Sequence, residues 1–201
     1  MAADREPSTE RLSDIVLGLA RRLRLRSLTD RYDSGAVLGA FAFVNGLISI
    51  AIMSLAALVT GQPFIFPSLG PTAFLLFYSP TLPTASPRNT ITGHLIGAAA
   101  GYVSLAIFGL LDEGPALLVG VDWPRVGAAA LSLGLTAGLM VWLKVPHPPA
   151  GATTLIVSLG LITTIPKLLV LMLGVILLVV QGLVINRLAG IDYPLWAPRS
   201  G

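Results

Sequence analysis

The chain has 201 residues, of which 54% are hydrophobic and 11% are charged, with a net charge of +3 and no cysteine. Soluble domains carry roughly 25% charged residues, so this composition indicates a membrane protein and excludes an ordinary soluble domain. The lack of cysteine also excludes disulfides, thiolate catalysis and zinc–thiolate sites.

Residues 1–35 are polar and rich in arginine, which gives the chain its basic character without forming a nucleic-acid-binding face. Apolar residues recur between the arginines at near-helical spacing, from Leu12 to Leu25. The pattern predicts an amphipathic helix on an anionic membrane surface, with a solvated basic leader that only fixes the topology as the alternative. In both cases the arginines indicate a cytoplasmic N-terminus.

Six apolar segments follow, and we expect them to form an all-α polytopic membrane protein. They cover residues 36–59, 64–78, 91–111, 126–143, 150–162 and 168–188. About 20 residues cross the hydrocarbon core as a helix, so the second and fifth segments are too short for a comfortable crossing. The order is long, short, long, twice over. We therefore divide the chain into a leader (1–35), a membrane repeat (36–111), an extramembrane loop (112–125), a second repeat (126–190) and a tail (191–201).

An internal duplication is indicated when the second half of the chain is laid over the first. Pro146 then falls on Pro67 and Pro166 on Pro87, and Lys167 stands beside Arg88. If the short segments cross, each repeat has three crossings and the second repeat is inverted; if they re-enter, the halves are parallel. Six crossings place Arg88 and Lys144 in the cytoplasm, in agreement with the positive-inside tendency, so we favour inverted repeats.

Each short segment begins at a proline-rich break, and we predict that the two breaks form the substrate site. A helix N-terminus carries roughly half a positive charge and binds anions through free backbone amides, and Pro71 and Pro149 are suited to the first helical position. Two such ends near the membrane midplane would make a small anion site. Packing kinks without a ligand are the alternative. The candidate substrate-binding residues are Ser68, Leu69, Gly70, Pro71, Thr72, Ala73, His147, Pro148, Pro149, Ala150, Gly151, Ala152 and Thr153.

His147 is the ionisable group inside the second break. Imidazole titrates near neutral pH, so this side chain could donate to an anion or carry a proton, or it could cap backbone carbonyls at the break. His94 and Asn45 are secondary candidates. His94 could face the same cavity or bond a neighbouring helix at the membrane interface. On the same segment, Gly93, Gly97 and Gly101 predict a close helix contact within or between protomers.

The run from Pro146 to Ala152, together with Pro67 to Ala73, resembles the HPP family of integral membrane proteins, whose His-Pro-Pro signature is here His147-Pro148-Pro149. The resemblance covers roughly residues 30 to 190. It implies four spanning helices, against the six crossings favoured above, and anion transport, since some members are associated with nitrite. Some members carry C-terminal CBS modules; this sequence shows none, so regulation by nucleotides is not implied.

Together these features predict transport of a small monovalent anion, with nitrite as the expected substrate. The alternatives are a passive anion channel and a non-transporting membrane scaffold or subunit. We expect no enzyme activity, because the spans hold no acid pair, metal cluster or Ser-His arrangement. We also expect no catalytic residues, metal or cofactor. The expected partners are the lipid bilayer, a small inorganic anion and further copies of the chain, but no nucleic acid, and the expected location is the cell (inner) membrane.

Overall fold

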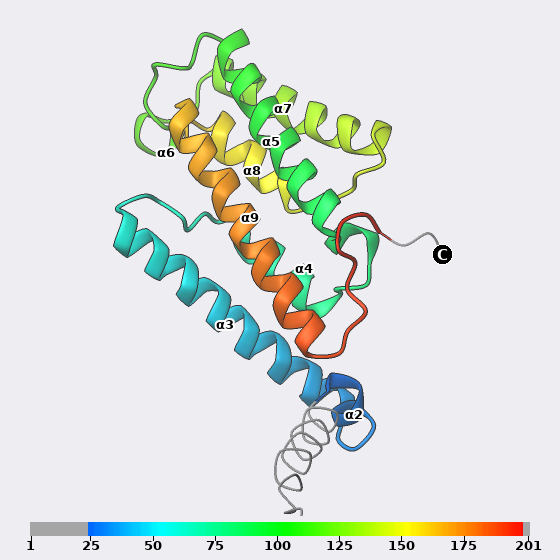
Figure 1. Cartoon of the computed structure of the whole chain (residues 1–201). Coiled ribbons are helices and arrows are strands. Elements are labelled where there is room, and N and C mark those ends of the chain that lie inside the picture. Colours follow the sequence, from blue (N-terminus) through cyan, green and yellow to red (C-terminus); the bar gives the residue numbers. More distant parts are fainter. Residues whose placement is uncertain (1–23, 199–201) are drawn as a thin grey trace, which may run out of the picture.

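The computed structural model describes residues 24–198, and this part of the chain is all-α, with no strand (Figure 1). The predicted fold class is therefore confirmed. The predicted amphipathic helix from Leu12 lies outside the described residues, apart from its end. The helices are α2 (Leu25–Thr29), α3 (Ser34–Thr60), α4 (Leu69–Tyr78), η1 (Pro83–Ala85), α5 (Pro87–Ile107), α6 (Ala116–Val119), α7 (Trp123–Trp142), α8 (Ala150–Ser158) and α9 (Ile165–Leu188).

Four helices, α3, α5, α7 and α9, are long and apolar enough to cross a membrane. They have 27, 21, 20 and 24 residues. Two of them begin with a proline in the first turn and a capping side chain: Ser86 accepts from the Asn89 amide and Asp122 from the Arg125 amide. Such caps satisfy backbone donors that the first turn of a helix leaves free.

The helices α4 and α8 are half-helices of 10 and 9 residues. At 1.5 Å per residue each is roughly half as long as a ~30 Å hydrocarbon core is thick. Both start a little differently from the prediction. Pro71 is the third residue of α4, and Pro149 is the N-cap of α8. Proline is tolerated at these places because amides of the first turn have no partner in the helix.

The half-helix α8 is largely buried, whereas α4 buries one face and exposes the other. The long helix α9 runs beside both α3 and α4 (Figure 1). Gly174 of α9 lies against Leu69 and Gly182 against Leu76, so α4 and α9 are parallel. Gly93 and Gly101 of α5 lie against Ala150 and Val157 in the same order, so α5 and α8 are also parallel. The predicted duplication is not tested by these contacts and stays a prediction.

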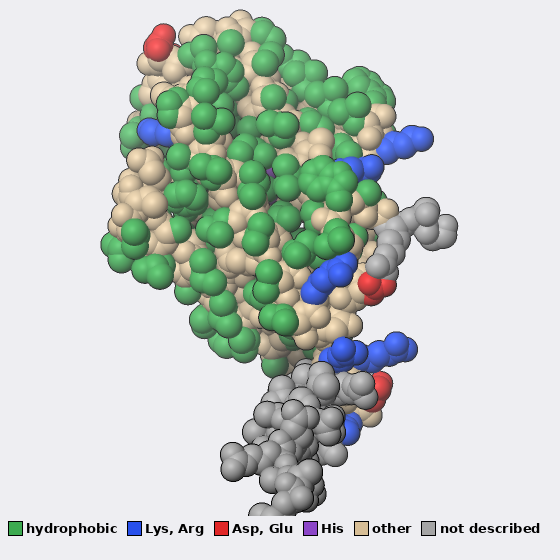
Figure 2. Space-filling view, in the orientation of Figure 1, with side chains coloured by type: hydrophobic (Ala, Val, Ile, Leu, Met, Phe, Trp, Pro, Cys, Tyr) green, Lys and Arg blue, Asp and Glu red, His purple; other side chains and the backbone are tan. Residues whose placement is uncertain are grey.

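The outside of the bundle is apolar over the described residues. Phe43 and Leu58 on α3 are 70% and 81% exposed, and both Trp123 and Trp142 at the two ends of α7 are exposed. Figure 2 shows hydrophobic side chains over most of one face, with the charged ones near its edges. Such a surface marks contact with lipid or with another protein. With four helices long and apolar enough to cross a membrane, the chain is a multi-pass membrane protein.

Candidate functional site

The two half-helices meet α5 at a buried cluster of two histidines and two threonines. His94 comes from α5, His147 from the break before α8, Thr72 from the first turn of α4 and Thr153 from the first turn of α8. Thr72 Oγ1 lies 2.9 Å from His94 Nε2 and 3.3 Å from His147 Nε2. The two breaks, which are far apart in the sequence, therefore lie side by side.

The two imidazole rings face each other at the centre of this cluster. Their Nε2 atoms are 3.2 Å apart and their ring centroids 4.9 Å apart. The other ring nitrogen of His94, Nδ1, lies 2.7 Å from Thr153 Oγ1. The other ring nitrogen of His147, Nδ1, lies 2.8 Å from the backbone oxygen of Thr84 and 3.4 Å from Thr90 Oγ1. Every ring nitrogen thus has a partner in the protein.

Close packing of α5 against α8 makes this arrangement possible. A Cβ at Gly93 would lie 2.7 Å from His147 Cβ, and a Cβ at Gly101 would lie 2.7 Å from Val157 Cβ. Side chains at these places would push the second break away from α5. The glycine contact expected from the sequence is therefore found within one chain, between α5 and α8.

The cluster is closed to solvent, since Thr72, His94, His147 and Thr153 have no exposed surface. Its surroundings hold positive rather than negative charge. The described acids stand at 30, 33, 112, 113, 122 and 192, outside the four long helices and the two half-helices. Two basic residues, Arg88 and Lys144, lie near the second break. Arg88 is at the start of α5, and its Nη2 donates to the Lys144 carbonyl at 3.0 Å.

The backbone amides predicted as anion donors at the second break already have partners within the chain. In α8, the amides of Ala150, Gly151 and Ala152 donate to the carbonyls of His147, Pro148 and Pro149 at 3.0 to 3.1 Å. Such tight first turns satisfy free amides within the chain. At α4, the N-cap Ser68 is fully buried and its hydroxyl has no partner among the described residues. A polar atom open to a ligand therefore lies at the α4 start.

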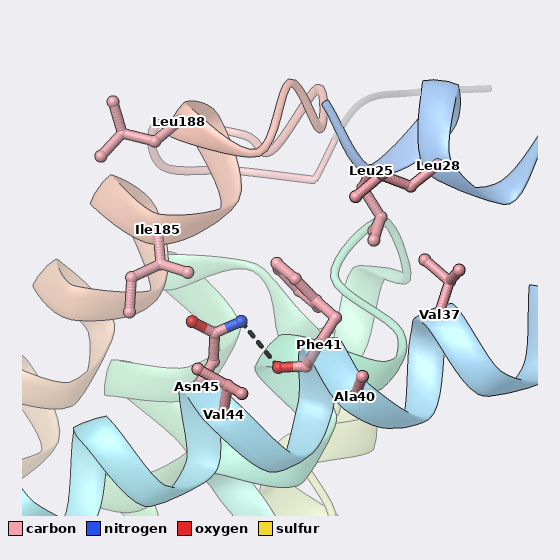
Figure 3. A pocket seen from close by; sticks show the side chains of 9 residues that line it. All are labelled: Leu25, Leu28, Val37, Ala40, Phe41, Val44, Asn45, Ile185 and Leu188. Atoms are coloured by element: carbon pink, nitrogen blue, oxygen red, sulfur yellow. Dashed lines mark hydrogen bonds between the residues drawn. The ribbon is translucent and has the colours of Figure 1, made fainter. Parts of the chain in front are cut away.

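Several predicted site residues lie beside the cluster rather than in it. Gly70, Pro71 and Pro148 are exposed, whereas Leu69, Ala73, Pro149 and Ala150 are buried around the break. Asn45 is separate: its Nδ2 donates to the Phe41 carbonyl of its own helix at 2.7 Å. Figure 3 shows it in an apolar pocket between α2, α3 and α9, with Ile185 and Leu188.

Sequence reasoning missed Thr84 and Thr90. Thr90 stands one helical turn before His94 on α5, and this i, i+4 spacing was a usable signal. Thr84 contributes only its backbone oxygen, which every residue type has, so the sequence could not have identified this position. Among the described residues there is no group of three or more His, Cys, Asp or Glu that could hold a metal ion.

Comparisons with known proteins agree on a membrane family. A family model described as "HPP, transmembrane region" matches residues 35–194. Two Dictyostelium discoideum proteins, both named as transmembrane proteins, are similar to the chain. One is 30% identical over 112 residues, covering 55% of this chain and 33% of the relative. The other is 27% identical over 165 residues, covering 77% of this chain and 53% of the relative.

The chain thus spans about a third of one relative and about half of the other. No solved structure matches. The matched range of the family model covers most of the chain and includes α3 to α9 with both breaks. The chain belongs to the HPP transmembrane region family.

Proposed function

We propose that this protein transports a small monovalent anion across a membrane and that nitrite is its substrate. The observation that carries the proposal is the meeting of both half-helix starts at one buried cluster of hydroxyl and imidazole groups. Non-helical backbone at membrane depth occurs where it is buried in protein or lines a polar cavity. In transporters, broken helices of this kind form the substrate site.

An anion fits this site better than a cation does. The half-helices α4 and α8 hold no acid, and their starts carry partial positive charge. The Ser68 hydroxyl, which has no partner among the described residues, can donate a hydrogen bond to a small oxyanion beside the cluster. Arg88 and Lys144 add positive charge near the same break, where they attract anions by their field.

Transport is tested with purified protein in lipid vesicles, by measuring uptake of nitrite against nitrate, formate and chloride. We expect saturable nitrite uptake above the leak of protein-free vesicles. Absence of uptake of all four anions would count against the proposal.

A matched pair of substitutions ties the transport to the cluster. Thr72 and Thr136 are both fully buried, and each hydroxyl donates to the carbonyl four residues earlier, at 2.9 and 2.8 Å. Only the Thr72 hydroxyl also contacts the two histidines. Thr72→Val should lower the uptake rate about tenfold, because a hydrogen bond at a closed polar site is worth roughly 1 to 3 kcal/mol. Thr136→Val should leave uptake unchanged. Equal rates in both variants would place the site elsewhere.

A further inference from the structure

The Nε2 atoms of His94 and His147 lie 3.2 Å apart, and this contact bears on which second ion is transported with the anion. We propose that the two histidines together hold one extra proton, and only one, and that this proton crosses the membrane with the anion, one for one. The inference rests on the proposed function and names the second transported ion. It follows from counting hydrogen-bond donors and acceptors around the two rings.

The protonation of His147 Nδ1 is fixed by its partner. This nitrogen lies 2.8 Å from the Thr84 carbonyl oxygen, which can only accept a hydrogen bond. Nδ1 therefore carries a hydrogen whether the ring is neutral or charged. The proton that His147 can gain or lose is at Nε2, the atom that faces His94.

With both rings neutral, one pattern satisfies the whole cluster. His147 Nε2 has a lone pair, so His94 Nε2 carries the hydrogen and donates toward His147 Nε2 and Thr72 Oγ1. His94 Nδ1 then accepts from the Thr153 hydroxyl at 2.7 Å. The Thr72 hydroxyl donates its hydrogen bond to the Ser68 carbonyl at 2.9 Å. No donor faces another donor.

A first extra proton can be added without breaking this pattern. It comes from water on the more acidic side of the membrane and forms an N–H bond at His94 Nδ1. The Thr153 hydroxyl turns from donor to acceptor of the same 2.7 Å bond. The central hydrogen bond between the two Nε2 atoms is kept, and its proton can sit on either ring. On release, the N–H bond breaks and the proton returns to water on the other side.

A second extra proton has no place. Both Nε2 atoms would then carry a hydrogen, and two donors would face each other across 3.2 Å. Two positive rings would also lie with centroids 4.9 Å apart in a closed site, where like charges repel strongly. The pair therefore switches between no extra proton and one.

The charged pair has no counter-charge from the protein within the described residues. The elements around it are α4, η1, α5, α8 and the segment 143–149, with α7 and α9 packed against α5, and the Tyr193 hydroxyl donates to the Ala85 carbonyl in η1. None of these elements holds a carboxylate. Their titratable groups besides the two histidines are Tyr78, Arg88, Tyr102, Arg125, Lys144, Lys167, Arg187 and Tyr193. A buried charge needs a partner. A bound anion supplies it, so each ligand raises the affinity for the other.

Coupling is measured in vesicles with an internal pH dye and a membrane potential set by a potassium gradient. The inference predicts that an acidic outside drives nitrite uptake, that one proton enters per nitrite, and that the potential has no effect on the rate. Uptake driven by the potential without proton entry would overturn the inference and leave anion transport standing. No uptake of any anion would overturn both.

Substitutions at two neighbouring threonines distinguish an effect on proton binding from an effect on the packing of α8. Thr153 and Thr154 are both fully buried on α8, but the Thr153 hydroxyl contacts His94, while the Thr154 hydroxyl has no partner among the described residues. Proton uptake on nitrite binding is measured in weakly buffered detergent solution, which needs no transport. Thr153→Val should lower the proton affinity of the complex about tenfold, since a hydrogen bond to a charged group is lost. Thr153→Ser should restore it, and Thr154→Val should not change it.

The histidines themselves give the last test. His94→Gln and His147→Gln keep polar groups in the cluster but cannot bind a proton. Each variant should bind the proton more weakly than the wild type on nitrite binding, because the charge is no longer shared by two rings. Unchanged proton affinity in both variants would overturn the pair as the proton carrier. The Thr153 series decides the question if a histidine variant fails to fold.

Discussion

Gly97 on α5 and Ala150 on α8 touch backbone to backbone: a Cβ at Gly97 would lie 2.7 Å from the Ala150 carbonyl oxygen. This contact holds the second break against the helix that carries His94. Since a carbonyl oxygen in a half-helix cannot turn aside like a flexible side chain, even one added methyl group must move α8.

We therefore predict that Gly97→Ala lowers the thermal unfolding midpoint of the protein in detergent, by an amount corresponding to about 1 to 3 kcal/mol of overpacking. Gly134→Ala is the matched control. Gly134 is also inside a long helix, and a Cβ there would meet nothing within 4 Å. Its midpoint should stay or rise slightly, because alanine is the better helix former. A larger loss in Gly134→Ala than in Gly97→Ala would contradict the packing argument.

The sequence predicted the parts of the fold that depend on local chemistry. Proline-rich breaks and apolar run lengths indicated two half-helices among four long ones, and the three glycines of α5 indicated a close contact. These features are set by backbone sterics and hydrophobicity within a few residues. The segments expected at 91–111 and 168–188 begin a few residues earlier in the structure, at Pro87 and Ile165, because each helix has a proline in its first turn there.

The candidate site was harder to predict, because it depends on which helix faces meet. His94 ranked as a secondary candidate and is at the centre, 53 residues from His147 along the chain. Asn45, the other secondary candidate, donates a hydrogen bond to the Phe41 carbonyl of its own helix. Both are polar residues in apolar helices, so residue type could not separate them. The two residues differ in the direction their side chains point: α5 is rotated so that His94 points at the half-helices, whereas Asn45 on α3 does not reach the cluster.

Asn186 on α9 anchors the end of α4. Its Nδ2 donates to the Leu76 carbonyl at 3.0 Å, and the residue is fully buried. Leu76 is in the last turn of α4, where carbonyls have no partner in the helix. Asn186→Leu should therefore leave a buried carbonyl unpaired. The cost should be about 1 kcal/mol, because the variant also removes the Asn186 Oδ1 atom, which is buried without a partner among the described residues. The unfolding midpoint of the variant in detergent checks this, and a midpoint equal to that of the wild type would show that the bond is replaced.

The phenol of Tyr193 links the segment after α9 to η1, whose Thr84 carbonyl is the hydrogen-bond partner of His147. It donates to the Ala85 carbonyl at 2.6 Å, one residue after Thr84, and is fully buried. Burial raises the pKa of Tyr193 above its ordinary value of 10. The folded state thus favours the neutral phenol. This contribution to stability is fully present below pH 10 and is lost progressively as the pH rises above it.

Tyr193→Phe should accordingly cost stability at neutral pH, by about 1 kcal/mol for the lost hydrogen bond. The gap between wild type and variant should narrow as the pH is raised to about 11, because only the wild type loses the contribution of the neutral phenol. Unfolding midpoints of both proteins across this range test the prediction. A difference between the two midpoints that widens at alkaline pH would contradict a raised pKa of Tyr193 in the folded state.

Arg125 is a buried cation that closes the far end of α8. Its Nη1 donates to the carbonyl of Ser158, the last residue of α8, at 3.2 Å, and its Nη2 donates to the Gly114 carbonyl at 2.8 Å. Arg125 is only 2% exposed. A positive charge at a helix C-terminus is favourable, and the planar guanidinium reaches two carbonyls at once.

Arg125→Leu should therefore destabilise the protein by about 2 to 4 kcal/mol, since two buried carbonyls lose their donor. Arg125→Lys should recover only part of this, because a single ammonium group does not present the two-pronged geometry. Lys167→Leu is the control for charge alone: Lys167 is exposed in the first turn of α9. Its loss should have little effect on the unfolding midpoint. If Lys167→Leu and Arg125→Leu lower the midpoint equally, charge near this end of the bundle matters and the two carbonyl contacts do not.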